Sequence, residues 1–315
     1  MSRRRFLQLS AVGAAGTAAW VSTSQQWTPK FIRERFSEIG LDVQQAKHKP
    51  APDKWSDRQI TASWLGHSTI LINFYGLTIL TDPVLFGRVG ADLGFGTLGP
   101  KRRVAAALTA KEVPQVDLAL LSHAHLDHFD MPSLKTLRAD TQVVTASRTA
   151  DLFSGTKVAK NAKELSWGQK TVVKTGHGEI EVEAFQVKHW GARWRHDTYR
   201  GYNGYILSRG GKKIIFGGDT ALCNGFAEIK NKGPFELACM PIGAYNPWIY
   251  SHCNPEQAVR MANEAGAKHI LPIHHYTFRF GRECCTEPIE RLQEALKQEP
   301  ERLALKEAGE TFLVA

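Results

Sequence analysis

One segment limits the possible folds more than any other: a run of metal-ligand side chains directly after an apolar stretch. The stretch "VDLALL" has the length and composition of a buried strand, and the run His-Ala-His-Leu-Asp-His begins at residue 123. A loop leaving a strand end can turn His123 and His125 toward one point, and Asp127 and His128 toward a second point nearby. Imidazole and carboxylate groups are ligands for Zn²⁺ and its first-row neighbours. The segment therefore predicts a metal site at the end of a strand.

Ligand-type side chains also follow other predicted strands. Loop residues at strand ends, held by a rigid sheet, are where sites are usually built, and a site for two metal ions needs about six or seven protein ligands with a shared oxygen. The candidate ligands are His123, His125, Asp127, His128, His189, Asp219 and His274. For the last of these ligands, His275 is an alternative to His274.

The order of predicted elements indicates an α/β protein. Strand-like runs at 60–66, 69–76 and 77–83 form early hairpins, with a turn at Tyr75-Gly76. Later strands alternate with helical segments, among them one that begins after Asn254 with Pro255 in its first turn. This pattern predicts a core of two sheets with outer helices. The glycine-rich segment 86–103 shows no periodicity and is expected to be a long loop.

The N-terminus resembles an export signal. Arg3, Arg4 and Arg5 precede Phe6-Leu7 and a short run rich in Ala and Gly, as in twin-arginine signals. We expect residues 1–25 to be this signal or an N-terminal anchor, 26–56 an irregular lead-in, and 57–315 the domain that carries the candidate ligands. The twin-arginine machinery would then be a partner. The protein would be periplasmic, or attached to the inner membrane by an uncleaved N-terminus.

Charge and cysteine content exclude some classes of function. The net charge of +9 includes the three N-terminal arginines, and the rest is spread along the chain. No basic block predicts nucleic-acid binding, whereas a mild positive field favours anionic substrates or membrane surfaces. The five cysteines include an adjacent pair and no Cys-x-x-Cys spacing, so they do not suggest a disulfide framework.

Several short motifs between Ile60 and Phe280 resemble those of the metallo-β-lactamase superfamily. Within it, the chain is most similar to the N-acyl-phosphatidylethanolamine-hydrolysing phospholipase D family. The resemblance implies an αββα four-layer sandwich. The motifs, in order, are "WLGHST", "TDP", "GPKR", "SHAHLDH", "KHW", "GGDT", "PIGAY", "HCNPEQAV" and "PIHHYTF".

The resemblance also implies roles for individual residues. His123, His125 and His189 would hold one zinc ion, Asp127, His128 and His274 the other, and Asp219 would bridge them. Asp82 would orient a ligand histidine, and His67 would lie near the metals. The catalytic set would be Asp127, Asp219 and His252. Fe or Mn could replace zinc.

A di-zinc phosphodiesterase is the leading functional hypothesis. A hydroxide shared by the metals would attack phosphorus in an anionic phosphodiester or lipid, and the protein would associate with a membrane surface to reach such a lipid. Arg102 would bind the anionic headgroup, and Trp190 and Trp194 the apolar part. One alternative is a lactonase or other carboxyl-ester hydrolase on the same metal centre, and another is an exported metal-binding protein without catalysis.

Overall fold

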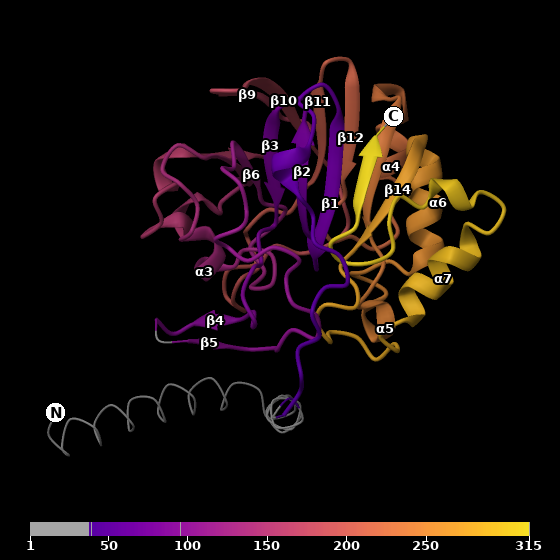
Figure 1. Cartoon of the computed structure of the whole chain (residues 1–315), viewed down its shortest axis with the longest axis horizontal. Helices are drawn as coiled ribbons and strands as arrows, with labels where there is room; N and C mark the ends of the chain where they lie inside the picture. Colours follow the sequence, from indigo (N-terminus) through magenta and orange to yellow (C-terminus); the bar gives the residue numbers. More distant parts are fainter. Residues whose placement is uncertain (1–37, 39, 95, 315) are drawn as a thin grey trace, which may run out of the picture. The chain divides into compact units, whose positions relative to one another are not determined.

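The computed structural model describes residues 38, 40–94 and 96–314 (Figure 1). The chain divides into two units, Met1–Asp42 and Val43–Ala315. In the first unit, the main-chain N–H of Leu41 donates to the carbonyl of Glu38 at 3.1 Å. The predicted export signal lies outside the described residues. None of the described helices combines the length and the apolar character that crossing a membrane requires.

The second unit contains a seven-stranded sheet in the order β15-β1-β2-β3-β6-β7-β8. Strands β15, β1, β2 and β3 are antiparallel, whereas β3, β6, β7 and β8 are parallel. The predicted hairpin turn at Tyr75-Gly76 joins β2 to β3. The bounds are β1 Ile60–Gly66, β2 Thr69–Phe74, β3 Leu77–Thr81, β6 Leu118–Leu120, β7 Gln142–Ala146, β8 Ala162–Leu165 and β15 Thr311–Val314.

A six-stranded sheet in the order β14-β13-β12-β11-β10-β9 faces the first. Strands β9 to β12 are antiparallel, and β12, β13 and β14 are parallel. The bounds are β9 Lys170–Thr175, β10 Gly178–Phe185, β11 Gly204–Arg209, β12 Lys212–Phe216, β13 Phe235–Pro241 and β14 Ala267–Ile273.

Helices cover the outer face of the second sheet, where α6 packs on β13 and β14 and is flanked by α4 and α7 (Figure 1). Helix α6 begins as predicted: Asn254 caps the main-chain N–H of Gln257, whose side chain returns the bond. The helices are α3 Met131–Leu134, α4 Gly225–Glu228, α5 Tyr245–Trp248, α6 Pro255–Ala265 and α7 Glu287–Ala295, with 3₁₀ turns at Pro52–Lys54, Ala150–Phe153, Ala159–Asn161, Lys230–Lys232 and Pro300–Arg302.

Apolar side chains fill three layers. Residues of both sheets, including Leu120 and Phe216, form the core between them. A second cluster lies between the six-stranded sheet and α4, α6 and α7, and a third lies outside the seven-stranded sheet. The layers confirm the predicted sandwich. The outer layer over the seven-stranded sheet differs from expectation because α3, short 3₁₀ turns and loops form it.

The segment expected to be a long loop contains a small hairpin. Strands β4 (Ala91–Asp92) and β5 (Thr97–Leu98) pair antiparallel within it. Strands of two residues are too short to show an alternation of apolar and polar side chains, so the sequence pattern does not predict them.

Candidate metal centre

The ligand-type side chains converge at one edge of the sandwich. Strands β1, β3 and β6 run in the same direction in the first sheet, as do β10, β12, β13 and β14 in the second. Their carboxyl ends therefore meet at the same edge. The side chains that follow these ends are His67, Asp82, the 123–128 cluster, His189, Asp219 and His274.

A first group of ligand atoms comes from His123, His125, His189 and Asp219. One ligand atom from each lies within 4.8 Å of all the others, which is compact enough for a single ion. Nδ1 of His189 hydrogen-bonds to the carbonyl of Ser251 at 2.9 Å, so its Nε2 faces the group.

A second group comes from His67, Asp127, His128 and His274, again within 4.8 Å. Oδ2 of Asp127 lies 3.5 Å from Nε2 of both His128 and His274. The same oxygen accepts a hydrogen bond from Nε2 of His67 at 3.0 Å. His67 is therefore either a direct ligand or a group that orients Asp127.

Asp219 lies between the two groups. Its Oδ2 is 3.1 Å from Nε2 of His128, 3.1 Å from Nε2 of His274 and 3.7 Å from Nε2 of His189. Its Oδ1 is buried and has no hydrogen-bond partner among the described residues. This carboxylate therefore belongs to the first group and also contacts two histidines of the second.

Buried ring nitrogens without partners show that the residues fit a metal. Within the described part of the chain, Nε2 of His123 and His125 makes no hydrogen bond. Nε2 of His128 and His274 has no well-aligned hydrogen bond either and contacts carboxylate oxygens at 3.1 Å or more. Buried polar atoms are normally paired, so such a site requires an explanation. A metal ion would satisfy these atoms, and the mixed nitrogen and oxygen set suits Zn²⁺ and other first-row ions.

Asp82 hydrogen-bonds to the residues that carry the histidine cluster. One carboxylate oxygen accepts from the main-chain N–H of Ser122, and the other accepts from the Ser122 hydroxyl and from Nδ1 of His128 at 2.7 Å. These bonds fix the loop before the cluster and turn Nε2 of His128 toward Asp219. The structure thus gives Asp82 the orienting contacts that the resemblance implies.

Three of these residues have strained backbones. His67, Asp82 and His274 have φ values of 53°, 30° and 60°. Non-glycine residues rarely adopt positive φ, and such strain clusters at functional sites. The left-handed turn after β14 also directs His274 and His275 to different places. His274 joins the metal-ligand groups, whereas the His275 ring stacks on Trp64 with 4.5 Å between the ring centroids.

Burial and charge divide the histidines into two classes. Burial lowers the pKa of His125 to about 4 and holds the pKa values of His123 and His189 well below the ordinary value. Burial also opposes protonation of His128 and His274, but Asp219 and Asp127 raise the pKa of His128 well above its usual range and that of His274 to about 9. Three rings are thus neutral at pH 7, and two hold protons in the metal-free protein.

The predicted catalytic residue His252 faces the same site. Its Nδ1 is 3.8 Å from Oδ2 of Asp219 and has no hydrogen-bond partner among the described residues. Burial lowers its pKa to about 4, so the ring is neutral at pH 7.

A cavity of about 310 Å³ opens over the two groups. Trp190 lines this cavity, and the centroid of its ring lies 4.5 Å from that of the His125 ring. Trp248 and Phe280 also line it, and sequence reasoning missed both because no motif or spacing connects them to the ligands. The lining residues are His125, Asp127, Trp190, Asp219, Ala244, Trp248, His252, His274 and Phe280.

The structure corrects the expectation for Arg102. Its side chain is 1% exposed, and its guanidinium donates to the carbonyls of Val104, Val84 and Leu65 at 3.0, 2.7 and 3.5 Å. Its donors are therefore directed at the main chain and are not available to a substrate. Arg102 ties together the segments that carry His67 and Asp82.

Only part of the segment after His189, which was expected to bind the apolar part of a substrate, faces the cavity. Trp190 lines the cavity, whereas Trp194 is not among the described residues that do. Arg193 donates to the carbonyls of Ala124 and Phe129 and so holds the histidine cluster in place. Arg200 pairs with Asp151 and Asp197. Both arginines thus make their contacts within the protein.

Comparisons with known proteins agree with this geometry. A family profile described as the β-lactamase superfamily domain matches residues 78–275. An uncharacterised protein of Mycobacterium tuberculosis is 31% identical over 260 residues, which cover 80% of this chain and 68% of the relative. The N-acyl-phosphatidylethanolamine-hydrolysing phospholipase D 1 of Caenorhabditis elegans is 30% identical over 260 residues, which cover 78% of this chain and 72% of the relative.

The fold also matches solved structures. A metallo hydrolase from the archaeon Ignicoccus hospitalis superposes with a TM-score of 0.62 at 19% identity. The match covers 82% of this chain and 99% of that one. At this identity the likeness supports the fold alone.

Proposed function

The chain belongs to the metallo-β-lactamase superfamily and is a metal-dependent hydrolase, and from this premise we propose that it cleaves the phosphodiester bond of N-acyl-phosphatidylethanolamine or a related lipid. Water would attack phosphorus and break its bond to the N-acylethanolamine oxygen, which releases phosphatidic acid and N-acylethanolamine, or their analogues. The observation that carries the proposal is the position of Asp219, whose Oδ2 lies 3.1 Å from Nε2 of both His128 and His274 and 3.7 Å from Nε2 of His189. The C. elegans relative favours the phosphodiester over other bonds.

Two zinc ions, held by the first and second groups, would lower the pKa of water and offset negative charge on the phosphoryl oxygens. The chain itself would position the attacking water. Asp127 and Asp219 keep their carboxylates ionised, because His128 holds their pKa values well below the usual range although burial opposes this. Ionised carboxylates accept hydrogen bonds from water and fix its direction.

His252 would contact the substrate or the attacking water. Its unpartnered Nδ1 faces Asp219 from the cavity wall. As a neutral ring, it can hydrogen-bond to a phosphoryl oxygen or to water without adding a charge. This arrangement supports the catalytic role that the resemblance implies.

The apolar part of a lipid would lie against the aromatic wall of the cavity. Trp190, Trp248 and Phe280 are on this wall, and aromatic rings cover apolar groups with few torsions to freeze. Ligand pockets commonly combine such a wall with a few polar groups. The combination of metal ligands and rings supports a phosphodiester that carries an apolar group.

The test is an activity panel on the purified protein with two equivalents of Zn²⁺. We expect release of phosphatidic acid from N-acyl-phosphatidylethanolamine micelles, cleavage of bis(4-nitrophenyl) phosphate, and loss of both activities in Asp219→Asn. Rapid opening of lactones without cleavage of either phosphodiester would replace this proposal with a lactonase. Absence of all turnover in a protein with two bound zinc ions would favour a metal-binding role.

We further propose that the protein is exported by the twin-arginine route and acts at a membrane surface. The N-terminal arginines and the following apolar run support export. That route carries folded proteins, which suits a chain whose ligands come from two sheets. A lipid substrate would bring the protein to the membrane surface.

A further inference from the structure

Two loops form one side of the cavity, and each brings an aromatic ring. The first loop follows β13 and includes the short helix α5, so it carries Ala244 and Trp248, and the second follows β14 and carries Phe280. The Phe280 ring lies 5.9 Å from the His274 ring and 5.6 Å from the His67 ring. The position of these loops relative to each other therefore sets the width of the cavity beside the metal ligands.

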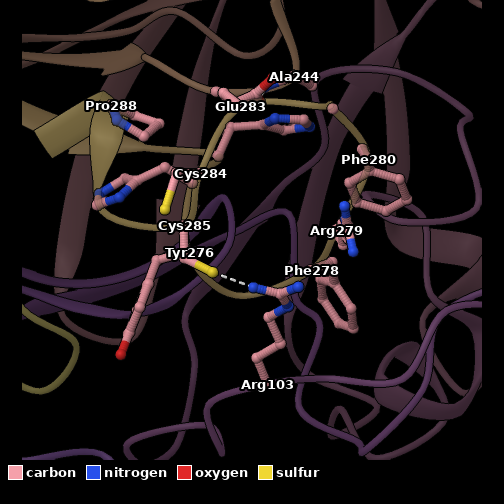
Figure 2. Close-up of a pocket in the computed structure, with 14 residues that line it drawn as sticks. Arg103, Ala244, Tyr276, Phe278, Arg279, Phe280, Glu283, Cys284, Cys285 and Pro288 are labelled. Atoms are coloured by element: carbon pink, nitrogen blue, oxygen red, sulfur yellow. Dashed lines mark hydrogen bonds between the residues drawn. The ribbon is translucent and has the colours of Figure 1, made fainter. Parts of the chain in front are cut away.

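The side chain of Glu283 joins the two loops. One carboxylate oxygen accepts a hydrogen bond from the main-chain N–H of Ala244 at 2.6 Å, and the other accepts from that of Asn246 at 3.4 Å. The main-chain N–H of Arg282 donates to the carbonyl of Asn246 at 2.8 Å. Figure 2 shows Glu283 beside Ala244, with Phe280 further along the same loop.

Two glycines allow this close approach. A Cβ on Gly243 would lie 2.2 Å from the carbonyl oxygen of His274, so a larger residue would separate the loops. A Cβ on Gly281 would lie 2.0 Å from the Glu283 carboxylate and would displace it from the two amides. The local sequence thus leaves space for this carboxylate and for the main-chain contact beneath it.

We propose that Glu283 is a positioning residue that clamps the loops after β13 and β14 and thereby fixes the apolar wall formed by Trp248 and Phe280. The inference rests on the proposed function, because the wall serves a substrate that carries an apolar group. Carboxylate bonds to main-chain N–H groups are among the stronger hydrogen bonds. Glu283 touches neither the metal ligands nor the reacting atoms, so its effect is on substrate binding.

The experiment compares Glu283→Ala with wild type in the full zinc-loaded chain. The KM for N-acyl-phosphatidylethanolamine micelles is expected to rise about tenfold, with kcat and the turnover of bis(4-nitrophenyl) phosphate within about threefold of wild type. Metal content should remain unchanged. Hydrogen exchange of the Ala244 and Asn246 amides should become faster, because both lose their acceptor.

Three further variants separate the clamp from general damage. Gly281→Ala retains the carboxylate but displaces it, so it should reproduce the Glu283→Ala effects. Glu283→Gln retains one accepting oxygen and should give an intermediate effect. Glu290→Ala removes an exposed carboxylate from α7 and should behave as wild type.

Unchanged exchange at Ala244 and Asn246 in Glu283→Ala would overturn the clamp. Equal losses on the lipid and the small diester, or an unchanged KM for the lipid, would overturn its role in substrate selection. If wild type cleaves neither substrate, the proposed function fails and the role in substrate selection falls with it. The exchange measurement then still decides whether Glu283 joins the loops.

Discussion

Nδ1 of His128 lies 2.7 Å from Oδ2 of Asp82, and both side chains are completely buried. The contact fixes the tautomer and direction of the ring, so that Nε2 faces Asp219 and Asp127. A carboxylate in this position also raises the basicity of the imidazole. We therefore expect the metal affinity to depend on Asp82, a residue that belongs to neither ligand group of four.

The first prediction concerns this carboxylate. Asp82→Asn should weaken metal binding by about 10–100-fold, because the amide retains the shape but loses the charge. The measurement is zinc affinity by competition with a chromogenic chelator. Asp117→Asn is the matched control, since Asp117 is also buried and pairs with His177 at 2.9 Å. Equal affinities for wild type and Asp82→Asn would contradict the orienting role.

The second prediction is that zinc binding releases protons at pH 7. His274, with a pKa of about 9, and His128, with a raised pKa, are protonated in the metal-free protein. Each must lose its proton before Nε2 can bind an ion, so about one to two protons should leave per chain. Affinity should then rise with pH until His274 titrates near pH 9. Calorimetry in buffers of different ionisation enthalpy measures the release, and identical heats in all buffers would contradict it.

Arg102→Lys should destabilise the fold without a selective loss of substrate affinity. Lysine cannot make the three carbonyl bonds that the buried guanidinium makes. The free energy of unfolding should fall by about 2–4 kcal/mol. Denaturant unfolding checks this value, and KM for a phosphodiester checks the binding role. A large rise in KM at unchanged stability would restore the original assignment to substrate binding.

The two exposed tryptophans after His189 should differ in effect. Trp190→Ala should raise the KM for a lipid phosphodiester about tenfold, because the indole lines the cavity and contacts the His125 ring. Trp194→Ala should change it less than about twofold. The residues are similarly exposed, at 42% and 37%, so each controls for the other. A larger effect of Trp194→Ala would mean that the substrate extends beyond the cavity.

Export should depend on Arg3 and Arg4. Replacement of both by lysine should retain the protein in the cytoplasm, because twin-arginine recognition requires the guanidinium pair. Fractionation of cells that produce the full chain measures the distribution. Dependence of export on the general secretion route, or periplasmic protein at the wild-type level in the double variant, would refute the prediction.

The candidate site could be predicted from sequence where its residues adjoin strand ends. Asp219 and His274 are far apart in the chain, but each follows an apolar strand, and parallel strands bring such residues to one edge. Arg102 could not be placed, because an arginine after a Gly-Pro turn has the same sequence whether its donors meet solvent or buried carbonyls. Trp248 and Phe280 depend on how two loops fold back over the sheet, and a single sequence contains no periodic signal for that path.

The donor atoms belong to loops that leave two different sheets. His123, His125, Asp127 and His128 follow the seven-stranded sheet, whereas His189, Asp219 and His274 follow the six-stranded one. The distances between the metal-ligand atoms therefore depend on the distance between the two sheets. Side chains in the core between the sheets, such as Leu120 and Phe216, set that distance. A change in core volume is therefore expected to change the affinity for metal as well. Selection for one ion over another can act on residues that never touch it.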